Sequence, residues 1–117
     1  MNIQIFGKPK CFDTKKAERY FKERKIKFQL IEINKYGLSK SEYQSIKSAV
    51  GGMYALIDEK SKEYESQHIR YLARQDDIEE RLLENPNMFK TPIVRNGKKA
   101  TIGYQPDIWA DWLYTKL

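Results

Sequence analysis

The sequence is poor in the residues that small disulfide and metal proteins use. Its 117 residues include one cysteine and one histidine. A single cysteine excludes an internal disulfide framework and a multi-cysteine zinc site, so we expect no metal centre. No uninterrupted apolar run of about 18 residues is present, which excludes a membrane-spanning helix. The first six residues do not resemble a signal peptide, so we expect a reducing, cytoplasmic location.

The charge excess is too small to identify a partner. Lysine and arginine number 22 against 16 acidic residues, a net charge of +6, and the mean hydropathy is −0.77. This excess suits a nucleic acid, an acidic protein or an anionic small molecule. Basic and acidic residues are interspersed, which is typical of an ordinary solvated surface. No glycine-rich phosphate loop or nucleic-acid-binding motif is present, so we expect no direct contact with nucleic acid.

The first third of the chain predicts a strand, a helix and a second strand. Apolar residues alternate over about 2–6, and a helical pattern begins near Asp13. The segment 28–33 is mostly apolar and rich in β-formers, which is typical of a central strand. This order indicates a βαβ unit with two parallel strands and a right-handed crossover.

The middle of the chain predicts helices, and the last third returns to strands. Ser39 and Glu42 form a candidate capping box for a helix. Two short strands at about 91–95 and 100–103 flank an Asn-Gly turn, and a final helix follows. We therefore expect one α/β domain over residues 1–117, with a four-stranded mixed sheet. Its order is β-α-β, a helical insertion at about 37–86, and β-β-α.

Cys11 is the residue that we single out for chemistry. A free cysteine is commonly a small buried apolar residue, but Cys11 lies between the first strand and a helix. Helix N–H groups and the neighbouring Lys8 and Lys10 favour the thiolate, which is the reactive form. Thr14 stands where a C-x-x-C motif would have its second cysteine, so an external thiol would have to complete a redox cycle. The Thr14 hydroxyl could bond the thiolate or simply cap the helix.

Five short segments along the chain form a recognisable series. They are Pro9-Lys10-Cys11, Lys15-Lys16-Ala17, Ser61-Lys62-Glu63-Tyr64, Leu83–Val94 and Ile102-Gly103-Tyr104. In this order they resemble the P-x-C loop, the K-K-A stretch, the S-K-x-Y segment, the N-P to R-P-I-V region and the closing V-G-Y of the arsenate reductase–Spx family, here called the ArsC family. The resemblance implies a thioredoxin-like fold related to glutaredoxins, with a cis Pro92 facing Cys11.

The resemblance also implies a function and a set of site residues. Cys11 would be the nucleophile of a thiol-dependent oxidoreductase, supported as a thiolate by Thr14 and Lys10. The substrate or thiol would be bound by Pro92, Thr91, Lys90, Lys60 and Arg95. No bound cofactor is expected. The partners would be a small thiol or oxyanion as substrate, with glutathione as co-substrate or a glutaredoxin-like protein as the reductant.

Departures from the family pattern argue against arsenate as the substrate. Arsenate reducers of this family hold the oxyanion with arginines, because a guanidinium offers two parallel donors. Here Thr91 and Lys60 stand where two of those arginines would be, and Gly7 stands where a histidine is common. We expect a more general glutathione- or glutaredoxin-dependent reductase. The alternative is an Spx-like, non-enzymatic regulator that binds RNA polymerase or another protein.

Overall fold

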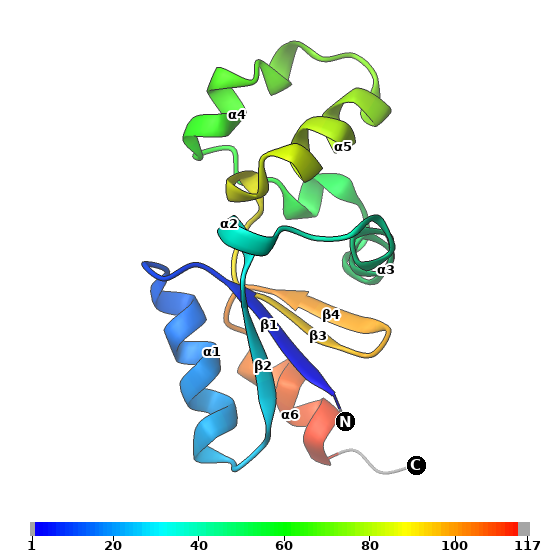
Figure 1. Cartoon of the computed structure of the whole chain (residues 1–117). Helices are drawn as coiled ribbons and strands as arrows, with labels where there is room; N and C mark the ends of the chain where they lie inside the picture. The colour runs from blue at the N-terminus through cyan, green and yellow to red at the C-terminus, as the bar shows by residue number, and fades with distance from the viewer. Residues whose placement is uncertain (1, 115–117) are drawn as a thin grey trace.

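The computed structural model describes residues 2–114, which form a four-stranded mixed sheet surrounded by helices (Figure 1). The strands are β1 (Ile3–Gly7), β2 (Phe28–Glu32), β3 (Ile93–Asn96) and β4 (Lys99–Ile102). Their order is β2-β1-β3-β4. The β1–β2 pair is parallel, and the β1–β3 and β3–β4 pairs are antiparallel. The predicted βαβ unit and C-terminal hairpin are both confirmed.

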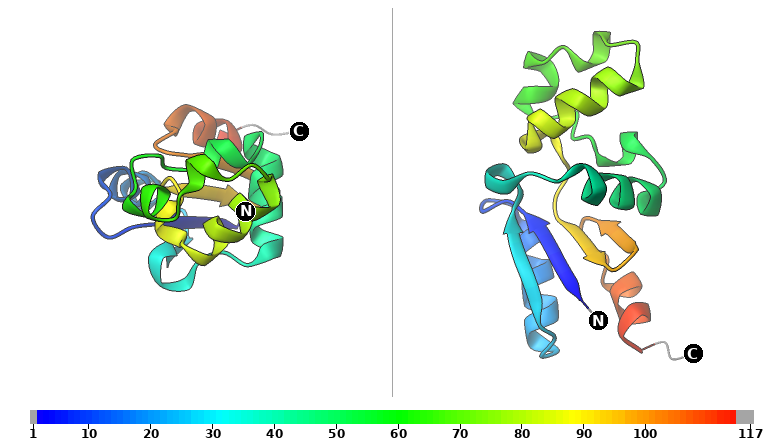
Figure 2. Two further views of the ribbon diagram at one scale, coloured as in Figure 1. Left: turned by 90° about the horizontal axis from the view of Figure 1, so that it is seen from above. Right: turned by 45° about the vertical axis from the view of Figure 1, so that its right-hand side comes forward.

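The helices fall into two groups. Two pack along the sheet: α1 (Phe12–Glu23) and α6 (Pro106–Tyr114). The elements between β2 and β3, which we call the insertion, are helical: α2 (Ile33–Tyr36), α3 (Lys40–Val50), η1 (Met53–Leu56), α4 (Lys62–Ser66), η2 (Ile69–Tyr71), α5 (Gln75–Glu84) and η3 (Pro86–Met88). Figure 2 shows the insertion stacked at one end of the sheet. No helix among residues 2–114 has the length and apolar character needed to cross a bilayer.

Neighbouring residues of a strand point to opposite faces, so the central strands contribute apolar side chains to a core on each face of the sheet. Ile3, Ile5 and Val94 belong to the core that α1 and α6 cover. Phe6 and Ile93 instead belong to the core shared with the insertion. The central strands β1 and β3 therefore connect the two cores, and the ends of these strands lie where the two parts of the molecule meet.

Two strand predictions need correction. The segment 28–33 was expected to form a central strand, but β2 is an edge strand that pairs only with β1, and its Leu30 is 48% exposed. Apolar content alone cannot distinguish a central strand from an edge strand. The central position beside β1 is set by its pairing with β3, which lies far from β1 in the sequence. The strand expected at 91–95 begins only at Ile93. Pro92, which precedes it, has no N–H group to donate to a ladder.

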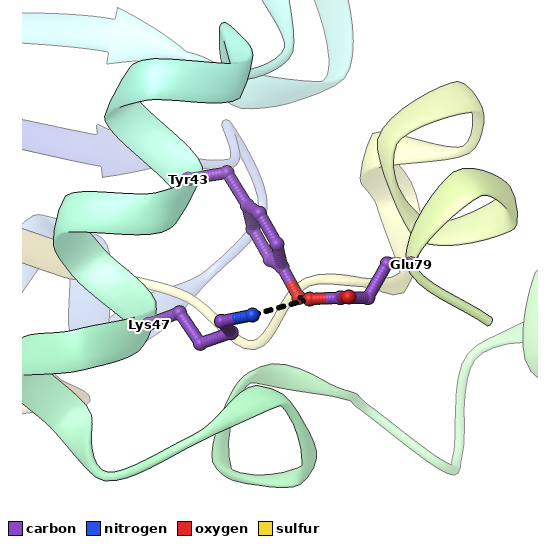
Figure 3. Close-up of polar contacts among 3 residues, drawn as sticks. All are labelled: Tyr43, Lys47 and Glu79. Carbon is purple, nitrogen blue, oxygen red and sulfur yellow. Dashed lines mark hydrogen bonds and ion pairs between the residues drawn. The ribbon is translucent and has the colours of Figure 1, made fainter. Parts of the chain in front are cut away.

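One carboxylate joins α3 to α5 inside the insertion. Glu79 Oε2 accepts hydrogen bonds from the Tyr43 hydroxyl at 2.5 Å and from Lys47 Nζ at 2.8 Å (Figure 3). Burial raises the pKa of Glu79, but the hydrogen bonds from Lys47 and Tyr43 and the charge of Lys47 outweigh it, so this pKa lies below its usual value. Burial and the Glu79 carboxylate together raise the pKa of Tyr43. The ionised carboxylate is therefore the form that holds the two helices together.

We expect this contact to make the free energy of unfolding fall as the pH is lowered. A carboxyl whose pKa is lower in the folded state stabilises the protein above its unfolded-state pKa, and this contribution is lost as the pH falls through the folded-state pKa. Glu79→Gln should lower the free energy of unfolding at neutral pH by about 1–3 kcal/mol. It should also flatten the loss of stability as the pH falls below about 5, measured by urea unfolding. The exposed neighbour Glu80, changed to Gln, is the control, and equal slopes for both variants would contradict this prediction.

Candidate functional site

Cys11 is the N-cap residue of α1, at the end of the loop that follows β1. Its backbone N–H donates to the Lys8 carbonyl at 3.1 Å, which fixes the turn just before the helix. The Sγ atom lies 3.6 Å from the carbonyl oxygen of Thr91, on the segment that leads into β3. Cys11 is partly exposed. The sulfur thus sits between a helix start and a segment that is 80 residues away in the chain.

The pKa of the Cys11 thiol lies below its usual value. Burial acts in the opposite direction and raises this pKa, because a thiolate is poorly solvated in a partly buried position. Hydrogen bonds from the side chains of Thr14 and Thr91, and from the backbone N–H groups of Thr14 and Asp13, favour the thiolate and outweigh burial. Since the thiolate is the nucleophilic form of cysteine, this environment increases the reactivity of Cys11 near neutral pH.

The Thr14 side chain, in the first turn of α1, packs closely against the end of β1. Its side chain is buried, and its Oγ1 accepts a hydrogen bond from the Lys8 backbone N–H at 3.4 Å. A Cβ atom on Gly7 would lie only 2.2 Å from Thr14 Cγ2, so this approach requires glycine at position 7. Cys11 rather than Thr14 is the N-cap of α1, and the Thr14 side chain is among the groups that lower the pKa of Cys11. A histidine at position 7 would displace Thr14.

Cys11 opens into a cleft of about 850 Å³ between the end of the sheet and the insertion. The cleft brings together five residues that the sequence proposed for the site: Cys11, Lys10, Lys60, Lys90 and Thr91. The three lysines are exposed, so their ammonium groups are free to meet a ligand in solvent. The structure therefore collects positive charge around the sulfur from the Cys11 loop, the insertion and the segment before β3.

The two other proposed residues are placed differently. The peptide bond between Thr91 and Pro92 is cis, as the resemblance implied, and Pro92 is buried directly after Thr91. Arg95 lies outside the cleft, because the strand carries it away toward the β3–β4 turn. There its guanidinium donates to the Gly97 carbonyl at 3.2 Å and to Gln4 Oε1 at 3.3 Å. Arg95 therefore does not join the lysines that surround Cys11 in the cleft.

Sequence reasoning missed three charged or aromatic residues of the cleft. Asp58 and Glu59 place carboxylates on its wall, and the exposed Tyr54 places an aromatic ring there. Their closeness to Lys60 in the chain was the only available signal. Lys8, noted for its charge alone, lines the cleft and is bonded to the far end of the insertion. Within residues 2–114, no group of three histidine, cysteine or acidic side chains is arranged to hold a metal ion.

Comparison with known proteins identifies the family of this chain. Residues 6–112 match the sequence profile of the ArsC family. The chain belongs to the ArsC family. Global transcriptional regulator Spx 2 of Oceanobacillus iheyensis is 29% identical over 110 residues, covering 92% of this chain and 80% of that protein. Global transcriptional regulator Spx of Streptococcus pyogenes serotype M1 is 26% identical over 107 residues, covering 90% and 80%.

Solved structures show the same fold. An arsenate reductase from Vibrio cholerae has a TM-score of 0.82 at 21% identity, covering 92% of this chain and 94% of that one. An arsenate reductase (ArsC) related protein from Brucella melitensis has a TM-score of 0.67 at 20% identity, covering 98% and 97%. These likenesses confirm the thioredoxin-like α/β fold of the ArsC family that the resemblance implied.

Gly7→Ala should destabilise this ArsC-family protein and raise the pKa of Cys11, because the new Cβ displaces Thr14. Overpacking of this kind costs about 1–3 kcal/mol. Thermal unfolding measures the stability, and the rate of Cys11 alkylation by iodoacetamide against pH measures the pKa. Thr14→Val is the matched control: it keeps the methyl group and loses the hydroxyl, so it should raise the pKa with a smaller loss of stability. Wild-type values for both quantities in Gly7→Ala would refute the packing explanation.

Proposed function

We propose that this protein is a monothiol oxidoreductase that reduces mixed disulfides between glutathione and another molecule. The observation that supports this most is the setting of Cys11: a sulfur at a helix N-cap, with a lowered pKa, on the wall of an open cleft. Membership of the ArsC family supports thiol chemistry at this position. The cleft has room beside the sulfur for a second thiol.

The reaction consists of two thiol–disulfide exchanges. In the first, the Cys11 thiolate attacks the glutathione sulfur of R–S–S–G. A bond forms between Sγ and that sulfur, the substrate S–S bond breaks, and R–S⁻ leaves and takes a proton from water. In the second, the thiolate of another glutathione attacks the glutathione sulfur held on Cys11, which releases glutathione disulfide and the Cys11 thiolate. The net change converts R–S–S–G and one glutathione thiol into R–SH and glutathione disulfide.

The cleft suits a thiol that carries charges of both signs. Glutathione has two carboxylates and one ammonium group, and its carboxylates would meet the exposed Lys10, Lys60 and Lys90. Its ammonium group would meet Asp58 or Glu59 on the same wall. Because residue 14 is a threonine, Cys11 has no neighbouring thiol to resolve the mixed disulfide, so a second glutathione or a glutaredoxin-like protein has to do so.

Arsenate is a poor match for the same cleft. A tetrahedral oxyanion is held best by the paired donors of guanidinium groups, whereas lysine acts as a point charge. No arginine is among the residues found to line the cleft in the described part of the chain. Arg95 is engaged elsewhere, by Gly97 and Gln4. We therefore propose a disulfide rather than an oxyanion as the substrate.

An assay with purified protein separates the two substrates. With glutathione as the reductant, we expect turnover of a small glutathione mixed disulfide at least about tenfold faster than turnover of arsenate, a difference of about 1.4 kcal/mol in barrier. Cys11→Ser should abolish turnover, since the hydroxyl cannot form the disulfide intermediate. Equal activity in the Cys11→Ser variant would remove this residue from the mechanism, and faster arsenate turnover would reverse the choice of substrate.

A non-enzymatic regulator is the second candidate, favoured by the two Spx relatives. Those proteins are named global transcriptional regulators, and their likeness covers nine-tenths of this chain. A protein of this kind would bind RNA polymerase through its surface and would not need Cys11. Stoichiometric binding of purified RNA polymerase by both wild type and Cys11→Ala, together with no turnover of the mixed disulfide, would favour this candidate. Absence of binding at micromolar concentrations would eliminate it.

A further inference from the structure

We infer that Lys8 is a positioning residue, whose ammonium group fastens the end of the insertion to the Cys11 loop and so fixes the sulfur against Thr91. This inference concerns the same thiol as the proposed function and rests on that function in no other way. It assigns a task to a lysine that the reaction above does not use. Four contacts of Lys8, two from its side chain and two from its backbone, support it.

The side chain of Lys8 is bonded to main-chain carbonyls. Its Nζ donates to the carbonyl of Asn87 at 2.8 Å and to that of Phe89 at 3.0 Å. Both acceptors lie where the insertion returns to the sheet, about 80 residues along the chain. A partly buried ammonium group needs such acceptors, because it has three donors and loses water on burial. Lys8 is therefore held in one place, unlike a lysine in open solvent.

The backbone of Lys8 is bonded to Thr14 and Cys11. Its N–H donates to Thr14 Oγ1 at 3.4 Å, and its carbonyl accepts from the Cys11 N–H at 3.1 Å. One residue thus contacts the residue that bears the thiol, the threonine beneath it and the end of the insertion. Movement of the Lys8 side chain would be transmitted directly to the Cys11 turn.

These contacts connect the Cys11 loop to the segment that carries Thr91 on the other side of the sulfur. From Phe89 the chain needs two more residues to reach Thr91, whose carbonyl lies 3.6 Å from Cys11 Sγ. On its other side the same segment is bonded to the insertion, where Lys90 N–H donates to the Leu56 carbonyl at 2.8 Å. Lys8 supplies the attachment to the Cys11 loop. It is the contact through which a side chain of that loop holds the segment that carries Thr91.

Lys8 also differs electrically from the other lysines of the cleft. Lys8 is partly buried, whereas Lys10, Lys60 and Lys90 are exposed, and no ion pair of the described residues involves any of the four. The groups that face it are Asp58 and Glu63 from the insertion and Cys11 from its own loop. Burial lowers the pKa of Lys8, and these negative groups act against that effect. The lowered pKa of Cys11 comes first from the hydrogen bonds of Thr14, Thr91 and the Asp13 backbone, so Lys8 acts mainly by holding these groups in place, and its charge adds a smaller effect.

The test compares Lys8→Met with Lys22→Met, an exposed lysine of α1 whose loss changes the net charge equally. We expect Lys8→Met to raise the pKa in the Cys11 alkylation profile and to slow alkylation at pH 7 by up to about tenfold, the effect of one pKa unit. Lys22→Met should match wild type. Lys8→Arg keeps the charge and the donors and should restore most of the rate. A lower melting temperature with an unchanged profile would overturn the inference, because a merely structural lysine predicts that result.

A second variant covers the case in which Lys8→Met does not fold. Lys8→Gln keeps an N–H donor without the charge, and it too should raise the pKa in the profile. A wild-type profile in Lys8→Gln would overturn the inference. Alkylation requires no physiological substrate, so the two proposals fail separately. A shifted profile with no mixed-disulfide turnover in wild type would reject the proposed function alone, and turnover with an unshifted profile would reject the role of Lys8 alone.

Discussion

The hydrogen bonding of one sulfur atom is the interaction on which the rest of this site depends. Cys11 gains a reactive thiolate only if the donors around it outweigh the cost of partial burial. Those donors come from the first turn of α1 and from the segment before β3. The approach of α1 to β1, which the bare backbone of Gly7 permits, and the return of the chain from the insertion both serve to keep them in place.

The insertion has a chemical as well as a structural part in the site. It supplies Lys60 and the two carboxylates of the cleft wall, so the cleft has charges of both signs. Its own helices are joined through Glu79, and its last residues are bonded to Lys8. Charge, cleft shape and thiol position therefore depend on the same group of helices. This mixture of charges is the basis for proposing a zwitterionic thiol rather than an oxyanion as the ligand, because lysine lacks the paired donors of a guanidinium group.

Features that depend on neighbouring residues were predictable. The Ser39–Glu42 capping box forms as expected, and Gly51 ends that helix with φ of 93°, a conformation that glycine adopts without strain. The Asn-Gly turn and the final helix were also placed correctly. The edge position of β2 was not predictable, because strand order is set by β3, which arrives after the whole insertion. Arg95 was assigned to the site as a source of positive charge, yet the rise along β3 takes it away from the cleft.

The sequence by itself determined that a single cysteine would begin a helix, that no second thiol would stand beside it, and that the chain would follow the ArsC pattern. These properties are local, since a helix start and a C-x-x-T spacing need only adjacent residues. The tertiary structure alone decided which carbonyls would hold Lys8, which lysines would share the cleft with carboxylates, and which arginine would be excluded. Contacts of that kind join residues about 80 positions apart, and only the packing of the sheet against the insertion can select them.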